Sequence, residues 1–175
     1  MKKFILIFAI LAATAIKAQE FPDVQSIAFE GASFGNSRTD FLYQLKFHLG
    51  WQVLQSLDAG DILDGKYCDC DCLVAVEYTK ERKFPVSLYI SIMCDDSIKN
   101  SVFSAAIIRL SKWFGDPVSV ENRNDVKVWQ PKYSGYEMLN IYSSIVILEK
   151  EDKGITIKIM DMINKMILDS EKQKP

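Results

Sequence analysis

The chain has 175 residues, of which 49% are hydrophobic and 25% are charged, and its formal net charge is −2 at pH 7. A nearly balanced charge with no cluster of lysine and arginine excludes the electrostatic footprint that nucleic acid or anionic lipid requires. We therefore expect a protein or a small ligand as partner, and no nucleic acid.

The amino terminus is typical of a secretory signal peptide. Lys2 and Lys3 precede an apolar run over residues 4–16, and Lys17-Ala18 follows as a cleavage site. This run is shorter than the roughly 20 residues that a membrane-spanning helix needs. We expect cleavage after Ala18, a periplasmic or secreted location, and no membrane insertion of the mature chain. Cleavage lowers Lys plus Arg from 21 to 18 against 23 acidic residues, a net charge of about −5. Residues 19–175 are predicted to form one domain.

A predicted strand over residues 24–30 is followed by a predicted helix over 38–49. Ser37 and Asp40 have the spacing of a helix N-cap, in which the hydroxyl accepts a backbone N–H and the carboxylate lies at the positive helix end. The apolar residues at helical spacing are Phe41, Leu42, Leu45 and Leu49. Gly50 is a natural left-handed stop.

Apolar and β-branched residues next predict strands over 51–57, 67–79 and 85–94. The segment "GDILDGKY", residues 60–67, nearly matches a phosphate-binding loop. However, Tyr67 replaces the Ser or Thr that such a loop needs, and a strand follows where a helix is required. We interpret this segment as a turn between strands.

A second helix is predicted, with Asp96 or Ser97 as its N-cap, and it is expected to end before Gly115, with Pro117 just beyond. Its apolar stripe consists of Ile98, Val102, Phe103, Ala106, Ile107, Leu110, Trp113 and Phe114. Because this stripe is the longest in the chain, we expect the helix to organise the core.

Strands over 126–130, 141–149 and 155–161 are predicted next, with a hairpin turn at 150–154 and a short helix over 162–168. The element order predicts an α+β fold in which two main helices pack on one face of an antiparallel sheet. It also allows two units, each a helix followed by three strands, although the two halves share too little sequence to form a repeat.

Cysteines form the most unusual pattern in the sequence. Cys68, Cys70 and Cys72 alternate with aspartates, and Cys94 follows on the next predicted strand. In an antiparallel pair the numbers of directly opposed residues add to a constant. A three- or five-residue loop centred on Arg82 gives a sum of 164, which sets Cys70 opposite Cys94. A sum of 166 sets Cys72 opposite Cys94. With either even sum, the apolar residues of the two strands lie on the same face of the hairpin.

Opposed cross-strand cysteines have Cα atoms about 4.5–5.5 Å apart, within disulfide range, whereas cysteines two apart on a strand are about 6.6 Å apart. Since exported proteins meet oxidising conditions, we expect a structural disulfide from Cys94 to Cys70 or Cys72, with Cys68 as the third choice. Buried free thiols are one alternative. The other is a metal-binding or redox site of all four, although Cys68 and Cys72 would lie about 13 Å apart on an extended strand.

Aromatic residues gather between positions 123 and 142, around Pro131 and Gly135. They are Trp129, Tyr133, Tyr136 and Tyr142. Because Tyr and Trp give a large contact area at small entropy cost, we predict a binding surface there. The alternative is that part of this set covers the core.

His48 is the only histidine, and its place beside Leu45 favours a packing role. A cysteine with His48 is the one nucleophile–base pair that the composition allows, and spacing cannot establish their contact. We predict no catalytic residues and no cofactor.

Several short motifs carry a resemblance: "IAFEG" at 27–31, "LDGKY" at 63–67, "LSKWFGDP" at 110–117 and "KGITIKI" at 153–159. Together with the signal peptide and the short first helix, they resemble a loose group of small exported bacterial proteins of unknown function. The resemblance spans most of the mature chain and implies an α+β fold of helix-and-sheet units without catalytic residues. The cysteine cluster departs from that group.

Exported modules of similar architecture, such as the proteinaceous β-lactamase inhibitors and propeptide-like domains, bind proteins with an open sheet face; this is an analogy of fold. We therefore expect a non-enzymatic, exported module that binds a protein or ligand and is stabilised by one or more disulfides. The alternative is a thiol-based metal-binding or redox protein that uses the four cysteines.

Overall fold

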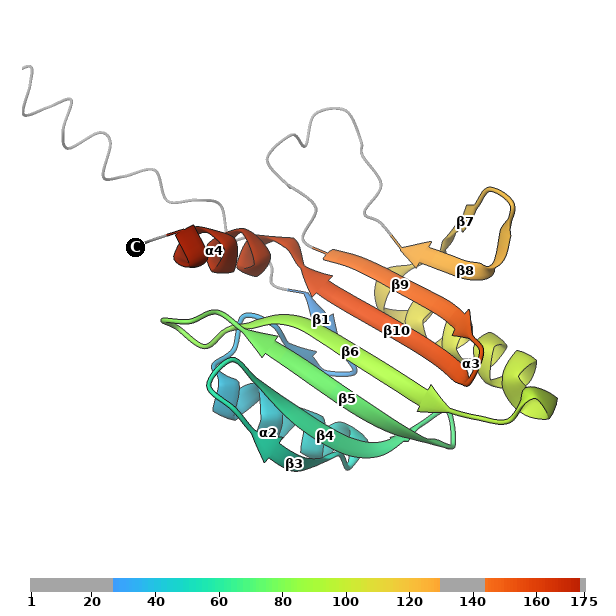
Figure 1. Cartoon of the computed structure of the whole chain (residues 1–175), viewed down its shortest axis with the longest axis horizontal. Helices are drawn as coiled ribbons and strands as arrows, with labels where there is room; N and C mark the ends of the chain where they lie inside the picture. Colours follow the sequence, from blue (N-terminus) through green and yellow to red (C-terminus); the bar gives the residue numbers. More distant parts are fainter. Residues whose placement is uncertain (1–26, 130–143, 174–175) are drawn as a thin grey trace, which may run out of the picture.

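The computed structural model describes residues 27–129 and 144–173. These residues form a large antiparallel sheet, a small two-stranded sheet and three helices (Figure 1). The helices are α2 (Arg38–Leu49), α3 (Asp96–Phe114) and α4 (Met162–Gln173). The first strands are β1 (Ala28–Phe29), β2 (Ala32–Ser33), β3 (Gln52–Ser56), β4 (Gly60–Tyr67), β5 (Cys70–Tyr78) and β6 (Pro85–Met93). The remaining strands are β7 (Val118–Val120), β8 (Arg123–Trp129), β9 (Ser144–Glu151) and β10 (Gly154–Asp161).

The main sheet has eight strands in the order β3-β4-β5-β6-β10-β9-β8-β7, and β1 pairs with β2 in a small separate sheet. Every pair is antiparallel. Consecutive strands are neighbours in β3 to β6 and again in β7 to β10, and β6 pairs with β10 where the two runs meet. The predicted α+β class with an antiparallel sheet is therefore confirmed. Four strands, rather than three, follow each of α2 and α3.

The segment predicted to be a turn, residues 60–67, is strand β4, so that prediction is wrong. The two glycines of β4 allow neighbouring groups to pack closely against its backbone. A Cβ added at Gly65 would lie 2.2 Å from Cδ1 of Trp51, and one at Gly60 would lie 2.4 Å from the carbonyl oxygen of Val76. Glycine here makes room for the neighbours and does not mark a change of chain direction.

Helix boundaries follow the predicted caps closely. The Ser37 hydroxyl accepts a hydrogen bond from the Asp40 backbone N–H, and Gly50 ends α2 with a φ of +71°. Helix α3 begins one residue after Asp95, slightly earlier than predicted, and ends before Gly115. Helix α4 extends to residue 173, beyond the predicted end at 168. Residues 24–26, 130 and 141–143 of the predicted strands lie outside the described residues.

The core is built on a row of opposed side chains that crosses five strands. Leu63, Val74, Ile90, Ile157 and Leu148 lie opposite one another in turn, and all are buried. Helix residues complete the same hydrophobic cluster: Phe41 and Leu45 of α2, with Val102, Phe103, Ala106 and Leu110 of α3. Figure 1 shows α2 and α3 behind the sheet, so the other face is turned toward the viewer.

Helix α4 lies past the ends of β6 and β10 (Figure 1) and is fixed by buried polar side chains. The Asn164 amide donates to the carbonyl oxygens of Phe34 and Pro85 at 3.0 and 2.8 Å. The Glu171 carboxylate accepts from the backbone N–H groups of Lys80 and Glu81 at 2.6 and 3.2 Å. These bonds attach α4 to Phe34, to the start of β6 and to the β5–β6 loop. None of the helices in residues 27–129 and 144–173 is both long and apolar enough to cross a membrane.

Candidate functional site

The cysteine cluster begins in a turn. Tyr67 lies opposite Cys70, so Cys68 and Asp69 form the two-residue loop of the β4–β5 hairpin. Both have positive φ, +51° and +63°, as in a type I′ turn. The sequence predicts a continuous strand from 67 to 79 because Cys-Asp lacks the glycine that usually marks this turn. Cys68 is consequently not on the strand that carries Cys70 and Cys72.

The register of the next hairpin confirms the sum of 164. Cys72 lies opposite Ile92 and Val76 opposite Leu88, and the register shifts only after Glu77. Continued for two residues beyond the paired Cys72 and Ile92, the same register would place Cys70 opposite Cys94. Cys72 itself is buried in the core.

Cys70 and Cys94 line a common cavity of about 410 Å³. Its charged lining residues are Lys66, Asp69, Asp71, Asp95 and Lys153. All four cysteines are free thiols in this structure. The predicted disulfide therefore stays a prediction, and the register favours Cys70 as the partner of Cys94.

The thiols are poorly suited to reactivity at neutral pH. Burial raises the pKa of Cys68 to about 11 and that of Cys72 to about 12. The pKa of Cys70 is also raised, first by burial and then by the negative charge of Asp69. The pKa of Cys94 is raised by burial and, to a smaller extent, by the neighbouring Cys70 thiol. A thiol that stays protonated is a weak nucleophile and a weak metal ligand. Within the described ranges, no three His, Cys, Asp or Glu side chains are placed to hold a metal ion together.

The open face of the sheet carries large apolar side chains near its centre. Leu73 on β5 and Tyr89 on β6 are 45% and 42% exposed. They share this face because they alternate with the buried Val74 and Ile90. Charged residues adjoin them: Asp64 lies opposite Leu73, and Lys158 lies opposite Tyr89. We call this area the open sheet face.

The predicted aromatic surface is only partly within the described residues. Trp129, the last residue of β8, is 2% exposed, and its indole N–H donates to the carbonyl oxygen of Gly115 at 2.8 Å. Trp129 is therefore a core residue and not part of an exposed surface, because the indole fills the space beside the end of α3. Tyr133, Tyr136 and Tyr142 lie outside the described residues.

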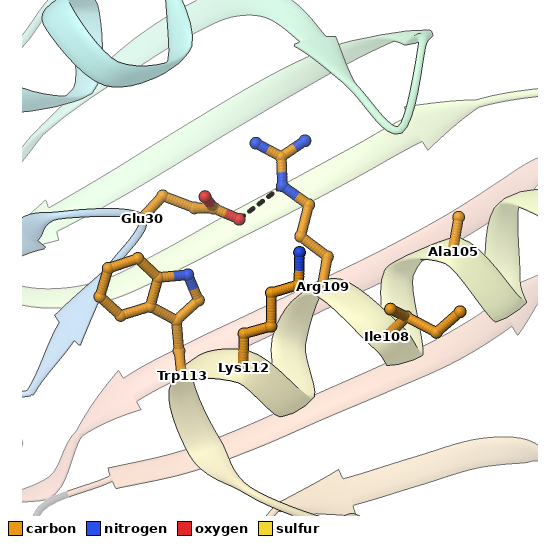
Figure 2. A pocket seen from close by; sticks show the side chains of 6 residues that line it. All are labelled: Glu30, Ala105, Ile108, Arg109, Lys112 and Trp113. Atoms are coloured by element: carbon orange, nitrogen blue, oxygen red, sulfur yellow. Dashed lines mark hydrogen bonds and ion pairs between the residues drawn. The ribbon is translucent and has the colours of Figure 1, made fainter.

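A second cavity, of about 520 Å³, lies between the β1–β2 turn and α3 (Figure 2). Its lining residues are Glu30, Ala105, Ile108, Arg109, Lys112 and Trp113. Glu30 comes from the turn, and the other five form one face of α3, next to its buried residues. Trp113, which was predicted to belong to the apolar stripe, lies on this exposed face. We call it the α3 cavity.

The turn that supplies Glu30 is held between two helices. Glu30 and Gly31 both have positive φ, +50° and +86°, and connect the opposed Phe29 and Ala32. A Cβ at Gly31 would lie 2.8 Å from Nε2 of His48, so the turn packs directly against α2. His48 makes this contact but is exposed, whereas its position beside Leu45 predicted a half-buried side chain.

Glu30 and Arg109 form an ion pair on the wall of the α3 cavity. Arg109 Nε donates to Glu30 Oε1 at 2.6 Å, and the Tyr67 hydroxyl donates to the same oxygen at 3.3 Å. The Arg109 guanidinium also lies over the Tyr67 ring, 4.4 Å from its centroid. Burial, followed by the Glu30 carboxylate, raises the pKa of Tyr67. The network joins α3, β4 and the β1–β2 turn.

Sequence patterns miss the α3 cavity. The one sequence feature that could have indicated this cavity is the pair of cations Arg109 and Lys112, three residues apart beside the apolar stripe. Glu30, however, is 79 positions before Arg109, and no local pattern connects them. The motif "IAFEG" contains Glu30 but gives no indication of its partner.

Comparison of the chain with protein-family models, with curated proteins and with solved structures found no match.

Proposed function

We propose that the protein is an exported, non-enzymatic module that binds a partner protein through the open sheet face. The observation that carries the proposal is the exposure of Leu73 and Tyr89 on two central strands of the sheet. An exposed Tyr and Leu beside charged residues have the composition of a non-obligate protein interface. The signal-peptide pattern at the amino terminus supports a periplasmic or secreted location.

Photo-crosslinking in intact cells tests this proposal. A photoreactive phenylalanine analogue is placed at Tyr89 and, separately, at Leu73. The matched control is Tyr43, which is 67% exposed but lies on α2. We expect the same crosslinked adduct, of one discrete mass, from each of the two sheet positions. No adduct of that mass is expected from Tyr43. Identical adducts from all three positions, or none from the sheet, would contradict the proposal.

Cys70 and Cys94 add a second part to the proposal, a disulfide that fixes one end of the β5–β6 hairpin. Its support is that the β5–β6 register, continued two residues beyond the paired Cys72 and Ile92, would bring them opposite each other, and that they line one cavity. Mature protein purified without reductant is expected to be lighter by two hydrogen masses than the reduced form. The Cys94→Ser variant removes this difference, whereas Cys72→Ser keeps it.

The second candidate function is a thiol-based metal-binding or redox protein. The observation that favours it is the presence of Asp69, Asp71 and Asp95 in the lining of the cavity of Cys70 and Cys94. In the same mass measurement, performed under native conditions without chelator, this candidate predicts bound metal and four thiols that can be alkylated after denaturation. That result would replace the disulfide in our proposal.

A further inference from the structure

We propose that the α3 cavity binds a small amphipathic carboxylate. Arg109 and Lys112 contact its carboxylate, and its apolar body packs against one of the apolar side chains on either side of them, Trp113 or Ile108. This site lies at α3, behind the sheet in Figure 1, and is independent of the open sheet face. The volume of about 520 Å³ lies within the range of known small-ligand sites, about 300–1,000 Å³.

Arg109 is held in place by the protein before any ligand binds. Its Nε donates to Glu30, and its guanidinium carbon lies 4.4 Å from the centroid of the Tyr67 ring. The side chains of Glu30 and Arg109 are 13% and 35% exposed. Of the guanidinium nitrogens, Nε makes the hydrogen bond to Glu30. Among the hydrogen bonds of the described residues, the two Nη groups have no protein acceptor, and in Figure 2 they point away from the helix.

Lys112 supplies a second positive charge one helical turn after Arg109. Lys112 is exposed and has no ion pair among the described residues. Glu30 neutralises one of the two cations, so the lining carries one net positive charge. This excess favours a single anionic group, and an arginine with free Nη donors is well suited to a carboxylate.

The rest of the lining is apolar. Trp113 lies at one end of the group of side chains, and Ile108 and Ala105 at the other, with the two cations between them (Figure 2). Trp113 and Ile108 are 44% and 64% exposed. Large apolar side chains next to a fixed cation favour a ligand with an aromatic or aliphatic body over inorganic phosphate, which has no apolar surface to bury.

The test is an NMR titration of the mature, uniformly nitrogen-labelled protein. The probes are phenylacetate and hexanoate, each compared with its neutral amide, and inorganic phosphate is titrated in parallel. We expect saturable shifts in the backbone amides of residues 105–113 and of Glu30 with both carboxylates. The amides are expected to bind at least about tenfold more weakly, since they lack the charge-assisted bonds.

Two variants locate the charge requirement. Lys112→Gln removes an exposed charge with no ion pair and is expected to weaken binding about fivefold. Arg109→Lys keeps a cation for Glu30 but loses the planar fork, and is expected to weaken it about tenfold. Lys158→Gln on the open sheet face is the matched control and should leave the affinity unchanged.

Three results would overturn the inference: equal binding of the amides, equal binding of inorganic phosphate, or shifts that do not include residues 105–113. A loss of affinity in Lys158→Gln as large as in Lys112→Gln would also do so. None of these results bears on the crosslinks expected from Tyr89, so the two proposals can fail separately.

Discussion

Arg38 at the start of α2 and Asp61 on β4 form an ion pair with two hydrogen bonds. Arg38 Nε donates to Oδ2 at 2.9 Å, and Nη2 donates to Oδ1 at 2.5 Å. The Ser56 hydroxyl donates to the same Oδ1 at 2.6 Å. The Asp61 side chain is fully buried, while that of Arg38 is 23% exposed. The pair fixes the first helix to the β3–β4 hairpin.

Removal of the Asp61 charge is expected to destabilise the fold. Asp61→Asn leaves the half-buried Arg38 guanidinium without its carboxylate, at a cost of about 2–4 kcal/mol, below the value for a fully buried pair because Arg38 contacts solvent. Urea unfolding of the mature protein measures this change. Asp58→Asn, at an exposed neighbouring position, is the control and should change stability by less than about 0.5 kcal/mol. Equal effects of the two substitutions would argue against the ion pair.

Acid should remove the contribution of this ion pair. Burial alone raises the pKa of Asp61, but the hydrogen bonds from Arg38 and Ser56 outweigh it and hold the pKa below its usual value. The folded pKa is thus lower than the unfolded value of about 3.9. The stabilisation is present above that unfolded pKa and is lost as pH falls through the folded pKa. The free-energy gap between wild type and Asp61→Asn should therefore narrow below about pH 4.

Gly65→Ala is expected to destabilise the protein by about 1–3 kcal/mol, because its Cβ would collide with the ring of Trp51. The collision predicts a specific coupling. In a Trp51→Ala background the same substitution should cost much less, and a double-mutant cycle in urea measures the difference. Additive effects of the two substitutions would show that Gly65 is needed for another reason.

Glu171→Gln should loosen the attachment of α4. The carboxylate accepts two backbone N–H groups of the β5–β6 loop, and the amide oxygen is a weaker acceptor. We expect a loss of about 1–2 kcal/mol in urea unfolding. We also expect faster amide hydrogen exchange at Lys80 and Glu81. Unchanged exchange at these two residues would contradict the role assigned to Glu171.

Alkylation of the reduced protein should separate the cysteines. Cys70 and Cys94 line an open cavity, whereas Cys72 is buried and has a pKa raised to about 12. Iodoacetamide at pH 8 is expected to modify Cys70 and Cys94 first and Cys72 only after unfolding. Peptide mass spectrometry over time measures the order. Early modification of Cys72 would contradict its burial.

The sequence predicts those parts of the fold that local chemistry determines. Gly50 and Gly115 mark the ends of α2 and α3, and alternating apolar residues restrict the β5–β6 register to two even sums, of which the structure has 164. Secondary structure is predicted wrongly where a residue type has a role other than its usual one. Gly65 makes room for an indole and does not form a turn, while Cys68 and Asp69 form a tight turn without glycine.

The candidate sites could be predicted only in part. The cysteine pattern and the alternation on β5 and β6 indicate the thiol cavity and the open sheet face. Trp129 is of a residue type that is common in binding surfaces, but its burial depends on where α3 ends. The α3 cavity depends on a contact between Glu30 and Arg109, which only the assembled fold brings together.

The pairing of β6 with β10 has a consequence for how the chain folds. Ile90 lies opposite Ile157, so the two halves of the sheet join through residues far apart in sequence. Closing such a long loop is entropically costly, and pairings of this kind slow folding. The edge of β6 that faces away from β5 stays unpaired until the final strand arrives. A chain that is synthesised from its amino terminus therefore completes its sheet only after β10 has been made, and until then it presents β6 as an open template for association.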